Sequence, residues 1–175
     1  MKNSKIVLFV LSIILVGSCS HKYDSNTLGL DFYQWNLWQD EGAVQGDNLP
    51  SCGWDELHRG KGELVRIPAS LEDHFQSIEA SSVFWYHCRF TLPEQWEEKK
   101  ISMVLKEAGP VADVFLNGGL VGSFQEEEGA FKMDVSDVIY YIRDNHLSIR
   151  ITGVKPEEVG KSSGITETIL LQSGS

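Results

Sequence analysis

Apolar and polar side chains alternate from Val83 to Leu92, and this period of two restricts the fold more than any other feature of the sequence. Phe84 and Tyr86 would point to one face of a strand, while Trp85 and His87 would point to the other. Further alternating or apolar runs lie at residues 64–67, 101–106, 112–121, 131–135, 147–151 and 165–171. Because turn residues separate these runs and no long amphipathic helix interrupts them, the sequence predicts an all-β fold, a two-sheet β-sandwich of jelly-roll type.

The stretch ADVFLNGGLVGSF, residues 112–124, contains the clearest turn signal. Asn117 and Gly118 form the pair that a type I′ turn prefers, because both of its central residues need a positive φ. The sequence therefore predicts a β-hairpin with a two-residue loop. In this register Val114 would lie opposite Val121, and both side chains would face the core.

Residues 1–19 are similar to the signal peptide of a bacterial lipoprotein. A positively charged start precedes an apolar run from Ile6 to Val16, which is shorter than the roughly 20 residues of a membrane span. Leu15 to Cys19 resembles a lipobox, in which the cysteine becomes the lipid-modified first residue of the mature protein. An ordinary cleaved signal with a chance cysteine is the alternative.

The remaining chain has the length of one domain. We expect residues 20–27 to be a tether and residues 28–175 to form a single domain with one core. Lipid on Cys19 would anchor the protein in the cell envelope without spanning a membrane. The net charge is −10 and the mature part contains no basic run, so nucleic acid is not an expected partner.

Two cysteines remain in the expected domain, Cys52 and Cys88. Export would permit a disulfide between them. Cys88 is equally well explained as a small buried residue of its strand. The sequence leaves the disulfide open, because it does not show whether the two residues approach each other.

Four stretches follow one another in an order that is typical of a known domain. They are FWYHCRFTLP at 84–93, ADVFLNGGLVG at 112–122, FKMDVS at 131–136 and NHLSIRI at 145–151. Together they resemble the N-terminal sugar-binding domain of family 2 glycoside hydrolases, which include β-galactosidases, β-glucuronidases and β-mannosidases. The resemblance covers about residues 64–171 and implies a galactose-binding-domain-like jelly roll. His87 and Cys88 occupy places where the family usually has basic residues.

The resemblance implies the accessory domain without the catalytic one. The family's catalytic carboxylates lie on a (β/α)₈ barrel, which needs about 250 residues. We therefore expect no enzyme activity, and we expect carbohydrate as the partner, either captured directly or in support of a separately encoded glycoside hydrolase. The alternative is an interaction module that docks on a glycosidase or associates with itself, and a third interpretation is an enzyme with an unrecognised site.

Exposed aromatic rings can cover the apolar face of a sugar, while amides and carboxylates bind its hydroxyls. Four tryptophans lie in irregular segments, and the fifth points away from the core face of its strand. The sugar-binding candidates are Trp35, Trp38, Trp54, Trp85, Trp96, Asp113 and Asn117. Packing of the tryptophans against a small sandwich is the alternative.

Metal binding is not a strong feature of the sequence. Structural calcium stays open, because galactose-binding-like sandwiches often contain it, and Asp113 and Asp134 would be the ligands. No transition metal is expected, because the histidines at positions 58, 74, 87 and 146 lack ligand spacing. Glu126 to Glu128 is expected to be a solvated loop.

Overall fold

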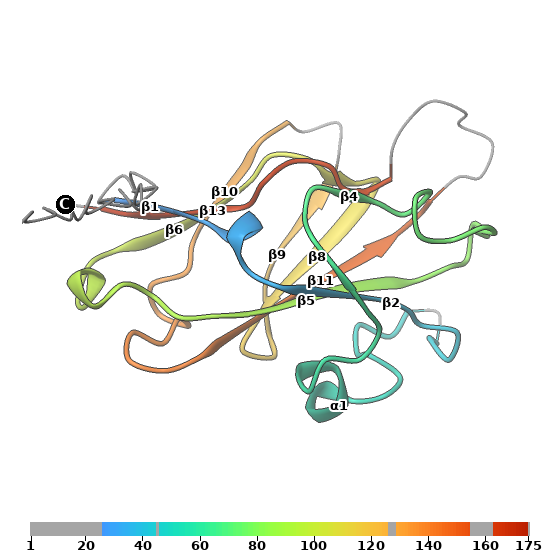
Figure 1. Cartoon of the computed structure of the whole chain (residues 1–175), viewed down its shortest axis with the longest axis horizontal. Helices are drawn as coiled ribbons and strands as arrows, with labels where there is room; N and C mark the ends of the chain where they lie inside the picture. The colour runs from blue at the N-terminus through green and yellow to red at the C-terminus, as the bar shows by residue number, and fades with distance from the viewer. Residues whose placement is uncertain (1–25, 45, 126–128, 155–162, 175) are drawn as a thin grey trace, which may run out of the picture.

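The computed structural model of the chain describes residues 26–44, 46–125, 129–154 and 163–174 (Figure 1). The expected signal peptide with Cys19, most of the tether, and Glu126 to Glu128 lie outside these ranges. No described helix is both long enough and apolar enough to cross a membrane.

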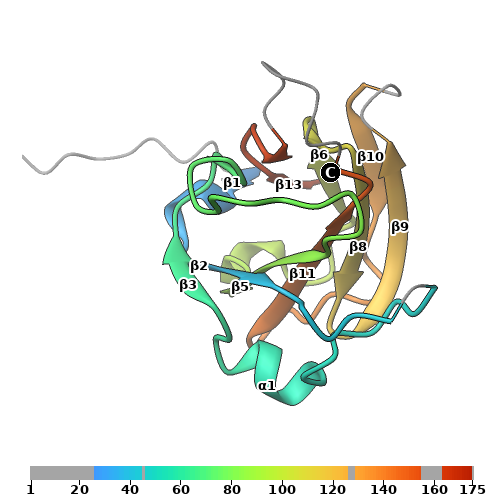
Figure 2. The same ribbon diagram turned by 90° about the vertical axis from the view of Figure 1, so that its right-hand side faces the viewer.

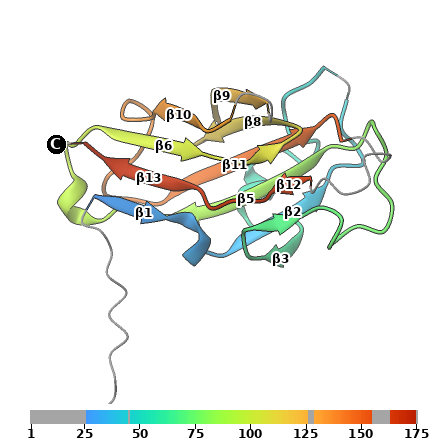
Figure 3. The same cartoon turned by 90° about the horizontal axis from the view of Figure 1, so that it is seen from above.

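Antiparallel strands make up nearly all of the regular structure (Figures 1 and 3). The six-stranded sheet has the order β3 (Glu63–Val65), β2 (Trp35–Gln39), β5 (Phe84–Phe90), β11 (Asn145–Thr152), β8 (Val111–Leu116) and β9 (Gly119–Gln125). The four-stranded sheet has the order β1 (Thr27–Gly29), β13 (Leu170–Ser173), β6 (Ile101–Leu105) and β10 (Phe131–Asp134). A small third sheet has the order β4 (Ala69–Ser70), β12 (Gly164–Ile165) and β7 (Ala108–Gly109). The helical turns are η1 (Leu30–Phe32), α1 (Trp54–His58) and η2 (Glu94–Trp96).

The main core fills the space between the six-stranded and four-stranded sheets (Figure 2). On β5 the side chains of Phe84, Tyr86 and Cys88 belong to this core, as the alternation predicts. Met103 and Leu171 meet them from the four-stranded sheet, and both are fully buried. The predicted all-β sandwich is confirmed. The small third sheet was not predicted, because its strands have only two residues each and show no alternation in the sequence.

The predicted hairpin is present, with φ of 54° at Asn117 and 85° at Gly118. Its register differs from the prediction one step beyond the turn, because an irregularity shifts the pairing between Val114 and Phe115. Val114 therefore lies opposite Gly122 instead of a valine. A β-bulge of this kind cannot be read from alternation, because it adds one residue to one strand only.

The outer face of the six-stranded sheet is covered as well. Helix α1 and its flanking segments lie against it, on the side away from the four-stranded sheet (Figure 2). A second apolar cluster forms there from Leu57, Val83, Trp85 and Phe115. The chain passes so close to β2 on its way to β3 that a side chain at Gly62 would collide with the Leu37 carbonyl group. The two tryptophans at positions 35 and 38, which we expected in an irregular segment, lie on β2, and β2 is an interior strand of the sheet.

The two cysteines of the domain are both free. Cys88 lies in the main core, whereas Cys52 packs against the cluster on the outer face. The sheet separates the two side chains, so the disulfide left open by the sequence does not form.

The two thiols should differ sharply in reactivity. Burial raises the pKa of Cys88 to about 12, and its residue is 1% exposed. The reactive thiolate of Cys88 would therefore form only near pH 12. Burial also raises the pKa of Cys52, but this side chain is only half-buried and is accessible to a reagent in the native chain. In the native chain we expect iodoacetamide at pH 8.5–9.5 to modify Cys52 and spare Cys88, as measured by peptide mapping. In denaturant both should react, and a disulfide-linked peptide pair would contradict the assignment.

A candidate functional site on the outer face of the six-stranded sheet

Three of the five candidate tryptophans are structural. Trp35, Trp85 and Trp96 are at most 1% exposed, so none of them offers a ring face to a ligand. Trp35 donates a hydrogen bond from Nε1 to the Leu30 carbonyl group at 2.9 Å. Trp85 donates from Nε1 to Asp40 Oδ2 at 3.2 Å. The expectation that these rings form sugar platforms is corrected, because Trp35 and Trp85 lie on a sheet that is covered on both faces and Trp96 ends η2 with its ring in the main core.

Trp38 and Trp54 are half-buried, and both stabilise the cover over the outer face. The Trp54 ring packs edge-on against Trp85, with ring centroids 5.6 Å apart. The Lys61 ammonium group lies 5.5 Å from the centre of the Trp38 ring, within the range of a cation–π interaction. These two rings therefore pack against the sandwich, which is the alternative to sugar binding that the sequence left open.

Asp113 and Asn117 make hydrogen bonds within the fold. Asp113 accepts one from Arg150 Nη1 at 3.1 Å and another from Ser123 Oγ at 2.6 Å. The Asn117 amide donates to the Val138 carbonyl group at 2.8 Å, and its Oδ1 accepts from the His146 backbone at 3.0 Å. The structure thus does not bring the predicted sugar-binding residues together in one place.

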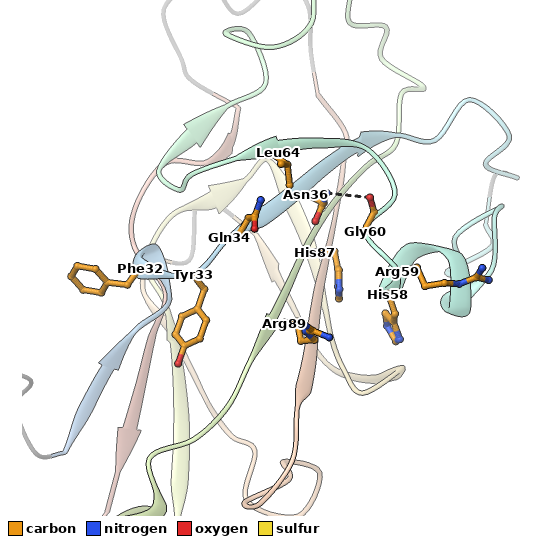
Figure 4. A pocket seen from close by; sticks show the side chains of 10 residues that line it. All are labelled: Phe32, Tyr33, Gln34, Asn36, His58, Arg59, Gly60, Leu64, His87 and Arg89. Atoms are coloured by element: carbon orange, nitrogen blue, oxygen red, sulfur yellow. Dashed lines mark hydrogen bonds between the residues drawn. The ribbon is translucent and has the colours of Figure 1, made fainter.

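A groove of about 720 Å³ lies beside α1, on the same outer face (Figure 4). Its walls come from η1, β2, β5, the end of α1 and the segment that leads to β3. The lining residues are Phe32, Tyr33, Gln34, Asn36, His58, Arg59, Gly60, Leu64, His87 and Arg89. Phe32 and Tyr33 form one end of the groove, and His58 and Arg59 form the other.

The aromatic end of the groove has the features expected of a sugar site. Phe32 is 57% exposed, and Gln34 lines the same groove. The Tyr33 hydroxyl donates to the Thr91 carbonyl group at 3.2 Å, which holds its ring in place. Asn36 donates from Nδ2 to Gly60 at 3.2 Å, and its amide oxygen remains available to a ligand hydroxyl on the groove wall. Sequence reasoning concentrated on tryptophan and did not identify this phenylalanine.

The charge of the groove is opposite to that of the whole chain. The chain has a net charge of −10, yet the described lining residues include Arg59 and Arg89 and no acidic side chain. A neighbouring hollow of about 400 Å³ shares Phe32 with the groove and adds Arg66. Arg89 is 3.6 Å from Asp144, in an exposed ion pair that leaves the guanidinium group open to solvent. The groove therefore suits a ligand with a negative charge.

Three histidines from different elements meet at the inner end of the groove. His58 ends α1, His87 lies on β5, and His146 lies on the neighbouring strand β11. Their rings are stacked, with centroid distances of 4.3 Å for His58–His146, 5.1 Å for His58–His87 and 5.4 Å for His87–His146. One nitrogen from each ring lies within 4.8 Å of the other two, a spacing that could hold a metal ion.

The expectation of no transition-metal site rested on spacing along the sequence, and this cluster requires a correction of that argument. Spacing detects ligands that share one helix or one turn, whereas these three come from a helix and two paired strands. The alternation on β5 did indicate that His87 points to the outer face. It could not indicate that His58 would be folded over it.

All three imidazoles are neutral at physiological pH. Burial, with a smaller contribution from the neighbouring imidazoles, lowers the pKa of His87 to about 3 and that of His58 to about 4. Burial also lowers the pKa of His146, and the positive charge of Arg89 adds to this effect. Neutral imidazole is the form that binds a metal ion.

Asp40 holds the cover of the outer face in place. It is 4% exposed, and its two oxygens accept hydrogen bonds from the Gly42 and Ser51 backbone nitrogens at 3.2 and 2.9 Å. The Ser51 hydroxyl and the Trp85 indole also donate to it. One carboxylate thus ties the loop before α1 to the sheet, and α1 in turn positions His58 and one wall of the groove.

No protein-family model matches the sequence, and no curated protein matches it. Solved structures do match. A calcium-binding mutant of Bacteroides uniformis β-glucuronidase 2 is 18% identical, with a TM-score of 0.64 over 84% of this chain and 18% of that one. A family 2 glycosyl hydrolase from Bacteroides cellulosilyticus is 15% identical, with a TM-score of 0.64, and the match covers 86% of this chain and 21% of that one. The β-D-glucuronidase of Dictyoglomus thermophilum is 17% identical, with a TM-score of 0.61, and the match covers 87% of this chain and 29% of that one.

The chain has the fold of a family 2 glycoside hydrolase domain. The resemblance to the N-terminal domain of these enzymes, drawn from four short motifs, is confirmed at the level of the fold. The chain spans less than a third of the length of these enzymes, and the described residues include no catalytic barrel.

Calcium is compatible with the family 2 fold, as the name of the B. uniformis mutant indicates for that protein. The two aspartates that we expected as ligands have other roles in this chain. Asp113 is paired with Arg150, and Asp134 accepts hydrogen bonds from both the hydroxyl and the backbone of Ser136.

Replacing Asp40 by alanine should loosen the cover of the outer face. The variant would leave the buried Trp85 indole and two backbone donors without their acceptor, so we expect a loss of about 2–4 kcal/mol in the free energy of unfolding. Urea denaturation would measure this loss, and limited proteolysis should show faster cleavage within residues 40–62. Asp47→Ala is the matched control, because the exposed Asp47 carboxylate accepts a hydrogen bond only from the nearby Leu49 backbone among described groups, and we expect a change within about 0.5 kcal/mol. Equal stability of the two variants would contradict the assigned role.

Proposed function

We propose that this family 2 domain is a non-catalytic carbohydrate-binding module and that the groove beside α1 is its sugar site. The observation that supports this most directly is the exposed Phe32, which lines the same groove as Gln34, Asn36 and two arginines. An aromatic ring can cover the apolar face of a sugar, and amides bind the hydroxyls at its rim.

The two arginines favour an acidic sugar. A guanidinium group binds a carboxylate through two parallel hydrogen bonds, which is the strongest contact that a sugar acid can make with a protein side chain. Two of the structurally similar proteins are named β-glucuronidases, and a uronic acid is the corresponding sugar class for this proposal. A neutral sugar would make the stacking contact but would gain nothing from the arginine charges.

The proposed setting is the cell envelope. Lipid on Cys19 would hold the module at a membrane, where it captures glycans or presents them to a separately encoded glycoside hydrolase. The chain's match to less than a third of the enzymes' length supports an accessory role over a catalytic one.

An interaction module is the second candidate, and one surface favours it. Residues 138–143 expose Ile142 at 84%, Val138 at 39% and Tyr140 at 37%, around a mostly apolar hollow of about 500 Å³. A group of neighbouring exposed apolar side chains marks a protein-binding surface more often than a single exposed apolar residue does. A glycosidase domain or a second copy of the chain would be the partner.

Binding of the full chain, purified in mild detergent, to paired glucuronic acid and glucose oligosaccharides tests the proposal. We expect millimolar or tighter binding with a preference for the acidic member. Phe32→Ala should weaken binding of both sugars by about tenfold, equivalent to about 1.4 kcal/mol, because the stacking surface is lost. Arg89→Ala should weaken binding of the acidic sugar alone. Calorimetry or NMR chemical shifts would measure the affinities.

Tyr140→Ala is the matched control, since this aromatic ring is exposed outside the groove. It should leave sugar binding unchanged. Absence of binding to every glycan at millimolar concentration would refute the proposal, as would unchanged binding in Phe32→Ala. A shift from oligomer to monomer in Tyr140→Ala, without sugar binding by the parent chain, would support the interaction module instead.

A further inference from the structure

Two buried imidazole nitrogens at the inner end of the groove have no hydrogen-bond partner among the described residues. They are His58 Nε2 and His146 Nδ1, and their rings are the closest pair in the cluster. A buried polar atom without a partner costs about 1–3 kcal/mol, and proteins therefore rarely leave one unexplained. Two adjacent ones point to a bound group that accepts lone pairs from both.

We propose that His58, His87 and His146 bind a divalent transition-metal ion of the zinc type. One nitrogen of each ring lies within 4.8 Å of the other two. Tetrahedral zinc with Zn–N bonds of about 2.0–2.1 Å would bring the nitrogens to about 3.4 Å from one another. The lone pairs lie in the ring planes, and the three rings are within 26° of parallel, so the rings must both approach and rotate to converge on one ion. His58 ends a helix of five residues and is the ring best placed to move.

The ligand chemistry selects the class of ion. Imidazole nitrogen suits zinc, copper, cobalt and nickel, whereas calcium and magnesium require oxygen ligands. Each of the three side chains presents nitrogen, and the described part of the chain places no carboxylate in the cluster. This site is therefore separate from the calcium expected of the fold, and it does not depend on sugar binding.

A neighbouring group orients one of the rings. The Ser148 hydroxyl lies 3.2 Å from His87 Nδ1. In the tautomer in which Nδ1 donates to this oxygen, the lone pair lies on Nε2, which is how outer-shell partners orient metal-binding histidines. The backbone of His146 donates to Asn117 Oδ1 at 3.0 Å, which ties the start of β11 to the hairpin turn. The His87 ring and the backbone position of His146 are thus fixed before an ion binds.

The three histidines leave one coordination position of a tetrahedral ion open. His58 and His87 both line the groove (Figure 4), so an ion that they hold would lie beside the space proposed for the sugar. A water molecule or an oxygen of a groove ligand would complete the coordination, as in other three-histidine zinc sites. An ion here would add positive charge to a groove that already contains Arg59 and Arg89.

Metal titration of the full chain tests the inference. The protein, purified in mild detergent, would be stripped with EDTA, dialysed and titrated with ZnCl₂ in a calorimeter and with CoCl₂ in a spectrophotometer. We expect one ion per chain and the visible absorption bands of tetrahedral cobalt. His58→Gln and His146→Gln should each weaken binding by at least about 100-fold, because the loss of even an outer-shell partner costs up to that factor.

His74→Gln is the matched control, because His74 lies outside the cluster and pairs with Glu63 at 2.7 Å. It should bind zinc as the parent chain does, and circular dichroism would confirm that each variant is folded. Substitution of the fully buried His87 is a poorer test, because it would also disturb the sheet. Absence of stoichiometric binding, or binding that survives both His58→Gln and His146→Gln, would overturn the inference and leave a packing role for the stacked rings. If the chain binds no zinc but the EDTA-stripped chain still binds sugar, the metal inference fails and the proposed function does not.

Discussion

The structure depends on burying both faces of the six-stranded sheet. One face packs on the four-stranded sheet through an ordinary apolar core. The other is covered by a loop and a five-residue helix that are too short to fold alone, so they need specific attachment. The Asp40 carboxylate provides it by accepting hydrogen bonds from both the loop and Trp85. Arg150 and Asp113 form a further buried pair at 3.1 Å on the same face. Polar contacts therefore position the cover, and apolar contacts of Trp54 and Leu57 stabilise it.

The groove exists because this cover ends part of the way across the sheet. α1 stops at His58, and the chain turns back toward β3 through the glycines at positions 60 and 62. Beyond that turn the outward side chains of β2 and β5 are no longer buried under apolar residues. Asn36, His87 and Arg89 lie there, and the 3₁₀ turn η1 brings Phe32 to the far wall. The same topology therefore buries Trp85 under α1 and leaves polar side chains of the sheet exposed to the groove between η1 and the end of α1.

Alternation in the sequence was sufficient to predict the sandwich, the strand β5 and the hairpin turn, because each depends on local geometry. It assigned Trp85 to the outer face correctly but could not show that the outer face is covered. The missing information lies in α1, which is too short to show helical periodicity. For the same reason the sequence separated His58, His87 and His146, which the fold brings together, and directed attention to tryptophans that support the fold. The four family motifs succeeded at the level of the fold because they mark strands and turns, and the groove residues lie mostly outside them.

The groove combines fixed positive charge with imidazoles that stay neutral. Arginine remains protonated at any physiological pH, so Arg59 and Arg89 contribute the same charge throughout. The pKa values of about 3 for His87 and about 4 for His58 keep these rings uncharged above pH 5, and Arg89 itself disfavours a proton on His87 and His146. The contribution of the two arginines, His58 and His87 to the attraction of an acidic ligand should therefore be nearly constant between pH 5 and 8. Within that range His58 and His87 cannot strengthen anion binding by taking up protons, and their lone pairs are free to serve as ligands.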